Sequence, residues 1–206
     1  CHVAGMMTGK AGLLHLHLGD GVRGLELVRQ ALEISELPSR TFHPTHCNRQ
    51  KRLWGEAVEL SRTRGIYVDV TTFEADEDSL DAVQAVLSWL DSGADPARLT
   101  ISSDGGGCLP TFDGDGVLLH MDVGDSAGLL ATLAQLVQGG VPLATVLPMV
   151  TRNVATLFRF HRKGRIAVGA DADVVALDEQ GQPRHLWAGG QQLVADGKIL
   201  IRELFA

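Results

Sequence analysis

The chain has 206 residues and a formal net charge of −7. It carries no run of lysine or arginine, so we expect no nucleic-acid partner, because phosphate binding requires a basic surface. Apolar residues make up 45% of the chain, as in ordinary globular proteins, and no stretch of about 18 apolar residues predicts a membrane span or membrane partner. The three cysteines are widely separated and form no CxxC motif, which favours a reducing compartment, the cytoplasm.

Strands alternate with helices through the first two-thirds of the chain. Apolar and β-branched runs predict strands over residues 13–18, 40–46, 66–72 and 99–103. Helical spacing predicts helices over residues 21–34, 50–64, 78–92, 126–138 and 143–160. Gly65 is expected to end the second of these helices, and Asp78 to cap the third. This rhythm indicates an α/β fold of parallel β/α units, and four such units make half of a (β/α)8 barrel.

The pattern changes after Lys163. The segments GRIAVGADADVVALD and HLWAGGQQLVADGKIL contain short apolar runs separated by Gly and Asp. Such runs predict strands joined by tight turns rather than further β/α units. We therefore expect two parts, a partial barrel over residues 1–163 and a β-rich segment over residues 164–206.

Three polar residues lie at the ends of predicted strands, namely His17, His46 and Asp104. In a barrel the C-terminal ends of the strands carry the active site. Imidazole and carboxylate groups bind Zn²⁺ and similar ions, which lower the pKa of a bound water to about 7. A nearby aspartate can then move a proton to a leaving amine. The three residues therefore predict a metal-dependent hydrolytic site, with Asp104 in both roles.

Each of these residues also has a simpler interpretation. A single histidine in an apolar strand can be structural, and His15 shares a strand face with His17, so these two could form a metal-binding pair by themselves. Asp104 could belong to a plain Asp-Gly turn, although the three glycines that follow favour close approach of backbone and substrate. Arg49 lies just beyond a strand end, where its guanidinium could grip a carboxylate, or it could simply start a solvated helix.

These motifs resemble the amidohydrolase superfamily, and within it the isoaspartyl (β-aspartyl) dipeptidases. GKAGLLHLHLGD is similar to the family's fifth-strand segment, which implies that His17 is a metal ligand. FHPTHCNR is similar to the sixth-strand motif PTHxNR, which implies that His46 is a second ligand of the same metal and that Arg49 binds the substrate's α-carboxylate. ISSDGGG is similar to the eighth-strand motif, which implies that Asp104 is a ligand of the other metal and the general base. The stretches GRIAVGADADVVALD and VADGK resemble the superfamily's small β-sandwich, and PTHxNR together with SSDG points to the dipeptidase branch.

The resemblance implies a metallopeptidase that uses two zinc ions to hydrolyse β-aspartyl dipeptides, in a complete protein that forms a homo-oligomer. Cys108 occupies the position of a substrate-contacting serine in the family. The family's first-strand HxH pair and bridging carboxylated lysine would lie before Cys1, and Lys10, in a helix-to-strand connection, is not that lysine. We therefore expect the chain to be the C-terminal part of a longer protein and to have negligible activity alone.

Two other interpretations remain open from the sequence. A different amidohydrolase, such as an N-acyl-amino-acid deacylase or a cyclic-amide hydrolase, would share the fold and the metal site. An inactive fragment or scaffold would keep the fold without turnover.

Overall fold

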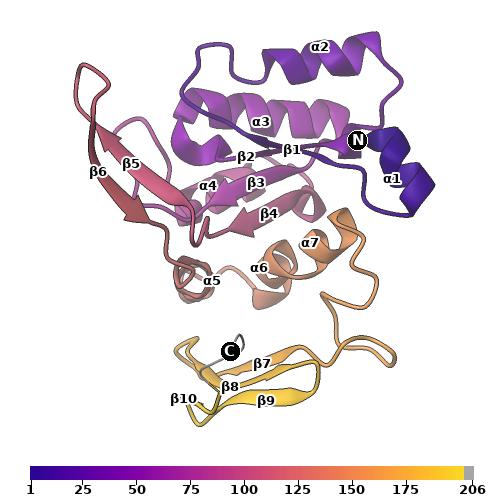
Figure 1. Cartoon of the computed structure of the whole chain (residues 1–206), viewed down its shortest axis with the longest axis vertical. Coiled ribbons are helices and arrows are strands. Elements are labelled where there is room, and N and C mark those ends of the chain that lie inside the picture. The colour runs from indigo at the N-terminus through magenta and orange to yellow at the C-terminus, as the bar shows by residue number, and fades with distance from the viewer. Residues whose placement is uncertain (202–206) are drawn as a thin grey trace.

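Four short parallel strands form the central layer of the protein, whose computed structural model describes residues 1–201 (Figure 1). They are β1 (Leu14–His17), β2 (Phe42–Thr45), β3 (Val68–Thr71) and β4 (Leu99–Ser102). β1 pairs in parallel with β2, β3 pairs in parallel with β4, and β2 lies beside β3. All four predicted strands are confirmed, as is the α/β class, although each strand is shorter than its apolar run.

Helices connect these strands, as a parallel arrangement requires. They are α2 (Glu26–Ile34) after β1, α3 (Lys51–Arg64) after β2 and α4 (Ala82–Asp91) after β3. Short 3₁₀ turns, η1 (Ser39–Thr41), η2 (Cys47–Arg49) and η3 (Pro96–Arg98), lie just before β2, just after it and just before β4. Gly65 ends α3 in the left-handed conformation at φ 71°, as predicted.

The prediction that Asp78 caps the helix after β3 is wrong. The cap is Asp81, whose side chain accepts a hydrogen bond from the Gln84 backbone N–H at 2.8 Å, while the Gln84 side chain accepts one from the Asp81 backbone. This reciprocal pair is a capping box. Asp78 instead lies in a tight turn held by Asp76, whose carboxylate accepts from the backbone N–H groups of Asp78 and Ser79.

Side chains alternate between the two faces of the strand layer. The face toward the helices is apolar and contains Phe42, Val68, Val70, Leu99 and Ile101, each no more than 4% exposed. The opposite face, called here the polar face, is made by His15, His17, His43, Thr45, Asp69, Thr71, Thr100 and Ser102. The interior of a (β/α)8 barrel is usually filled by branched apolar side chains. A polar face of this extent therefore indicates that these strands carry a candidate functional site.

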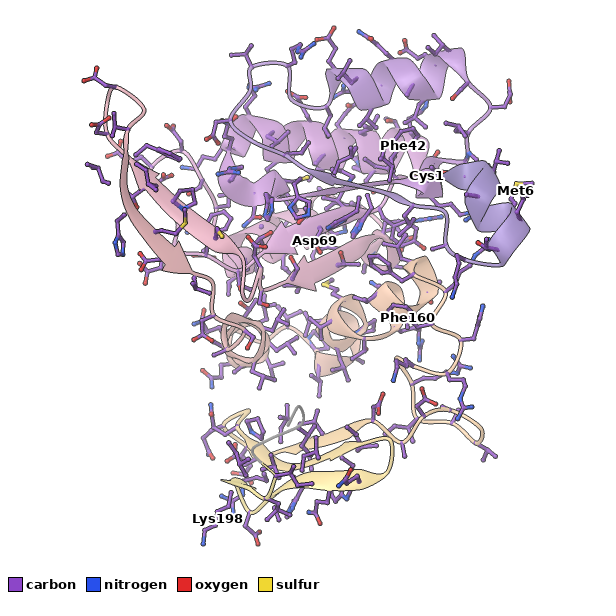
Figure 2. All side chains as sticks on the ribbon, in the orientation of Figure 1. Cys1, Met6, Phe42, Asp69, Phe160 and Lys198 are labelled. Carbon is purple, nitrogen blue, oxygen red and sulfur yellow. The ribbon has the colours of Figure 1, made fainter. Side chains whose placement is uncertain are left out.

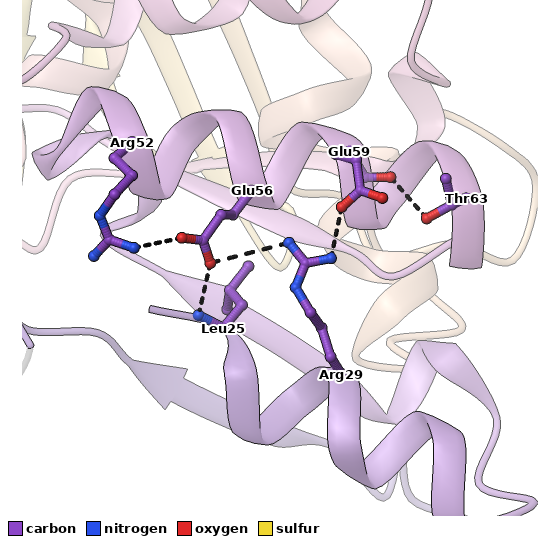
Figure 3. A network of polar contacts seen from close by, with 6 residues as sticks. All are labelled: Leu25, Arg29, Arg52, Glu56, Glu59 and Thr63. Carbon is purple, nitrogen blue, oxygen red and sulfur yellow. Dashed lines mark hydrogen bonds and ion pairs between the residues drawn. The ribbon is translucent and has the colours of Figure 1, made fainter. Parts of the chain in front are cut away.

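A charged network fastens α2 to α3 on the outside of the layer (Figure 3). Glu56 of α3 accepts hydrogen bonds from the Leu25 backbone N–H at 3.1 Å and from Arg52, and Arg29 of α2 bonds Glu59 at 2.6 Å. The Leu25 bond satisfies a backbone donor at the start of α2, where no earlier helical carbonyl is available. The helix predicted from residue 21 begins at Glu26 because Gly24 has a positive φ of 48°.

The helix predicted over residues 126–138 is present as α5 (Gly128–Gln138). The single helix predicted over residues 143–160 is divided into α6 (Leu143–Val150) and α7 (Arg152–Leu157). Pro148 lies inside α6 and has no N–H to donate, and Thr151 leaves the helical region at φ −131° and ψ −86°. Asn153 then binds the backbone carbonyls of Pro96 and Leu99 at 2.8 and 2.7 Å, which holds α7 against the start of β4.

Two features were not predicted from the sequence, the helix α1 (His2–Thr8) and an antiparallel hairpin of β5 (Cys108–Phe112) and β6 (Leu118–Val123). The hairpin extends from the body of the protein in Figure 1. Lys10 lies between α1 and β1, in a helix-to-strand connection as expected.

The C-terminal segment forms a separate antiparallel sheet, with strand order β10-β9-β8-β7 (Figure 1). Its strands are β7 (Val174–Leu177), β8 (Pro183–Ala188), β9 (Gln191–Ala195) and β10 (Lys198–Ile199). The predicted change to β structure is therefore found, while the boundary at residue 163 stays a prediction and residues 202–206 of the predicted segment lie outside the described residues. Within residues 1–201, no helix combines the length and apolar character needed to cross a membrane.

Candidate metal and substrate site

His17 and His46 meet at the C-terminal end of the strand layer. His17 is the last residue of β1, and His46 follows β2 directly. His46 adopts the left-handed conformation at φ 62°, which is uncommon for a residue other than glycine and turns the chain sharply after the strand. Nδ1 of His17 lies 3.0 Å from Nε2 of His46. One parallel β/α unit therefore brings His17 and His46 together, although they are 29 residues apart in the sequence.

This pair of imidazoles fits a shared metal ion. Two nitrogens 3.0 Å apart can both bind one ion at about 2.0–2.1 Å each. The second ring nitrogen of His46, Nδ1, lies 2.9 Å from Thr71 Oγ1, so Nε2 is the nitrogen that remains for a ligand. Among residues 1–201, however, no group of three or more His, Cys, Asp or Glu side chains is close enough to form a complete site. The structure brings the two histidines together, and their role as ligands stays a prediction.

Asp104 follows β4 at the same end of the layer, but it does not join the histidines as a third close group. Burial lowers the pKa of His46, and the charge of Asp104 opposes that fall, so the carboxylate acts on His46 through space. Asp104 itself has a positive φ of 52°, a conformation that aspartate and asparagine tolerate better than most residues. It is half-buried rather than fully exposed.

The glycines after Asp104 allow very close backbone packing. The Gly107 N–H donates to the Asp104 carbonyl at 2.8 Å, and a Cβ on Gly107 would lie 2.8 Å from the Asp104 carboxyl carbon. Gly124, directly after β6 at the base of the hairpin, packs even closer, since a Cβ there would lie 2.3 Å from the Asp104 carbonyl oxygen. The predicted close approach of backbone is therefore found; approach of a substrate stays a prediction.

Arg49 lies beside the two histidines at the end of η2. Its Nε contacts Asp20 Oδ1 at 3.0 Å, and one Nη donates to the Leu18 carbonyl at 2.9 Å. These contacts use two of the five guanidinium donors and hold the group in one orientation. Its charge also lowers the pKa of His46. The guanidinium is thus anchored on the loop after β1, and its role in binding a substrate carboxylate stays a prediction.

Cys108 is exposed and begins β5, where its Cα pairs with Val123 across the hairpin. It lies four residues after Asp104 but on the hairpin rather than in the glycine turn. Its predicted role in binding substrate stays a prediction.

Two buried residues of the site were not recognised in the sequence. Asn48 is fully buried, and its side chain bonds the backbone N–H and carbonyl of Thr71 at 3.0 and 2.9 Å and the Leu80 carbonyl at 2.9 Å. It therefore fixes η2 to the end of β3. Asp69 is 2% exposed in the middle of β3 and lies within the layer in Figure 2. An aspartate inside the run IYVDVTT was the signal that could have revealed it.

A model of the family described as "Amidohydrolase family" matches residues 14–198. The chain belongs to the amidohydrolase family. This amidohydrolase is similar to the solved structure of the β-aspartyl dipeptidase of Fervidobacterium islandicum AW-1 in complex with a β-Asp-Leu dipeptide. The two are 34% identical with a TM-score of 0.89, over 98% of this chain and 52% of that chain.

Other relatives are more distant. A curated adenine deaminase of Klebsiella pneumoniae strain 342 is 33% identical over 78 residues, which cover 37% of this chain and 13% of that protein. An adenosine deaminase of Xanthomonas campestris, solved with bound zinc, is 18% identical with a TM-score of 0.55 over 93% of this chain and 47% of that chain, and shows the fold alone. The chain thus spans about half the length of the solved structures that it matches.

Proposed function

We propose that the complete protein, of which this chain would be the C-terminal part, hydrolyses β-aspartyl (isoaspartyl) dipeptides in a metal-dependent reaction. The observation that carries the proposal is the convergence of His17 and His46 at 3.0 Å beside an anchored arginine. The similarity to a dipeptidase that binds β-Asp-Leu supports the same substrate class. We further propose that residues 1–163 correspond to about strands 5–8 of a (β/α)8 barrel, that residues 164–206 belong to a small β-sandwich, and that the protein is a cytoplasmic homo-oligomer.

His17 and His46 would hold one of two zinc ions, and Asp104 would be a ligand of the other. When bound, such ions supply Lewis-acid polarisation of the scissile carbonyl and activate water for attack. Each of the chain's own residues has a separate task. The Thr71 hydroxyl, 2.9 Å from His46 Nδ1, holds the ring so that Nε2 stays available. Asp104 accepts a proton and delivers it to the departing α-amine.

Arg49 would bind the substrate's α-carboxylate. Its bonds to Asp20 and the Leu18 carbonyl fix the plane of the guanidinium before substrate arrives, so less side-chain freedom is lost on binding. A charge-assisted fork onto a carboxylate also sets the distance between that carboxylate and the scissile bond. Cys108, at the start of β5, would add a contact from the hairpin side.

In the complete protein, Arg49→Lys is expected to raise KM for β-aspartyl-leucine by about 10- to 100-fold, because an ammonium group cannot make the two-pronged contact. The matched control is Arg64→Lys, since Arg64 also donates to a backbone carbonyl, that of Leu32 at 3.0 Å, but lies at the end of α3. Steady-state kinetics of both variants would check this. Equal KM values in the two variants would exclude the carboxylate-binding role.

A substrate panel tests the proposed function directly. Hydrolysis of β-aspartyl-leucine by the complete protein is compared with that of α-aspartyl-leucine, an N-acyl amino acid and a cyclic amide, with and without added Zn²⁺. We expect zinc-dependent turnover of the β-linked dipeptide alone. Turnover of the acyl amino acid or the cyclic amide in its place would reassign the substrate class, and no turnover of any compound would favour a scaffold.

A further inference from the structure

Asp69 is the common acceptor for three hydroxyl groups on the polar face. Thr100 donates to its Oδ1 at 2.5 Å, and Thr45 and Ser102 donate to its Oδ2 at 2.7 and 2.5 Å. Burial raises the pKa of Asp69 to about 6, while these three bonds favour the charged form and oppose the rise. The group is therefore a carboxylate at neutral pH, and each of the three hydroxyls gives it its only proton.

One branch of this network leads to His46. Thr71 Oγ1 lies 3.4 Å from Thr45 Oγ1 and 3.5 Å from Ser102 Oγ. Thr45 and Ser102 have already donated to Asp69, so their oxygens can only accept at these contacts. All three contacts of Thr71 Oγ1 are satisfied together only if Thr71 donates toward these oxygens and accepts from His46 Nδ1 at 2.9 Å. In that arrangement Nδ1 of His46 carries the proton, and Nε2 presents a lone pair toward His17.

The other branch leads to His43 and His15. Thr100 donates to Asp69, so it must accept from His43 Nε2 at 2.9 Å. His43 Nδ1 is then an acceptor, and His15 Nδ1, 3.0 Å away, is its donor. Burial lowers the pKa of His43 to about 3, which keeps the ring neutral as this arrangement requires. The protons of both branches are thus ordered toward the same carboxylate.

We propose that Asp69 is a positioning residue that fixes His46 as the Nδ1–H tautomer and so directs the Nε2 lone pair into the metal position beside His17. The ring nitrogen that binds a metal is commonly selected by the hydrogen bond of the other nitrogen. Here the carboxylate lies three hydrogen bonds from His46, along a path through Thr45 or Ser102 and then Thr71. The identity of His46 as a ligand rests on the proposed function, whereas its tautomer does not.

The tautomer can be measured without metal or substrate. Two-bond ¹H–¹⁵N correlation spectra of ¹⁵N-histidine-labelled, metal-free protein at about pH 8 distinguish protonated from unprotonated ring nitrogens; His46→Gln assigns the His46 signals. We expect the Nδ1–H form in the native protein and a mixture or the Nε2–H form in Asp69→Asn. An amide can both donate and accept, so the neighbouring hydroxyls would no longer all have to donate toward residue 69. A native His46 in the Nε2–H form would overturn the proposal.

A pair of variants at Thr71 keeps the test decisive if Asp69→Asn does not fold. Thr71→Val preserves the shape and the backbone bonds to Asn48 but removes the hydroxyl, and it is expected to release the tautomer as Asp69→Asn does. Thr71→Ser restores the hydroxyl and should restore the Nδ1–H form. The branch control is Thr100→Val, which removes the link to His43 and one donor to Asp69 but keeps the path through Thr45, Ser102 and Thr71, and it should leave His46 unchanged. An unchanged tautomer in Thr71→Val would overturn the proposal.

Zinc affinity, measured by competition with a chromophoric chelator, gives a second readout. Asp69→Asn and Thr71→Val are expected to weaken Zn²⁺ binding by about 10- to 100-fold, and Thr71→Ser to restore it. If the tautomer responds but no dipeptide is hydrolysed, the positioning role holds and the proposed function fails. If the dipeptide is hydrolysed but Asp69→Asn changes neither the His46 tautomer nor the zinc affinity, the positioning role fails and the proposed function holds.

Discussion

Asp104→Asn is expected to lower kcat for β-aspartyl-leucine by about 10²- to 10⁴-fold, which is the usual contribution of a positioned general base and acid. Asparagine cannot accept the proton and return it to the leaving amine. KM should change little, because the substrate carboxylate is assigned to Arg49. The measurement is steady-state kinetics of the purified complete protein, with Asp104→Asn beside the native sequence.

Asparagine is the correct substitution because Asp104 has φ 52°. Asparagine tolerates this left-handed conformation, whereas alanine would add strain to the loss of the carboxylate. Asp196→Asn is the matched control, because Asp196 is also an aspartate with positive φ, at 48°, in the exposed turn between β9 and β10. A kcat for Asp104→Asn equal to that of this control would exclude Asp104 as the proton-transfer group.

Acid should destabilise the protein through His43. Burial, helped by the nearby charge of His15, lowers the pKa of His43 to about 3 from its ordinary value of 6.5. The unfolded chain therefore binds a proton at this position that the folded chain does not. The stability contributed by the neutral ring is complete above pH 6.5 and is lost at about 1.4 kcal/mol per pH unit on the way to pH 3, about 5 kcal/mol in all.

Asp69 has the opposite effect in part of this range. Its pKa is raised from 3.8 to about 6, so the folded protein holds a proton between these values that the unfolded chain releases. Its contribution is complete below pH 3.8 and is lost as pH rises through 6, by about 3 kcal/mol. The two effects nearly cancel between pH 6 and 3.8, and the His43 loss dominates outside that window.

The contribution of His43 is isolated by comparing variants at each pH. Urea unfolding of the native protein and of His43→Gln gives two free energies of unfolding, and their difference removes all other titrations that the variant shares. We expect the stability of the native protein relative to His43→Gln to be greatest above pH 6.5. Below pH 6.5 this relative stability should fall by about 1.4 kcal/mol per pH unit. The exposed His161→Gln is the control and should show no such trend. A pH-independent difference for His43→Gln would show that His43 does not titrate as the buried ring requires.

The sequence was sufficient to predict the strand–helix alternation and the positions of polar residues at strand ends. Both depend on local patterns, the period of apolar residues and the polar residue that interrupts it. His17, His46 and Asp104 could be selected in this way because each ends an apolar run. The meeting of His17 with His46 then followed from the general rule that parallel strands bring their carboxyl ends to one edge.

The remaining features depend on contacts between distant segments. The network around Asp69 requires the register in which Asp69 pairs with Thr100 and His15 with His43, and no local pattern encodes that register. The break at Thr151 and the cap at Asp81 depend on where the neighbouring turns end. Sequence patterns locate a helix but do not define its terminal residues. The hairpin was missed because β6 is exposed along its whole length, so its sequence lacks a one-sided apolar pattern.

The contact between Gly124 and Asp104 also governs how the hairpin can move. The Gly106 N–H donates to the Gly124 carbonyl and the Gly124 N–H to the Gly107 carbonyl, each at 2.9 Å, so the ladder of β5 and β6 continues down to the turn that begins at Asp104. A swinging motion of the hairpin cannot pivot above that turn without breaking these bonds. A displacement of the hairpin at its base would therefore disturb the backbone that holds Asp104, the residue proposed above to transfer the proton.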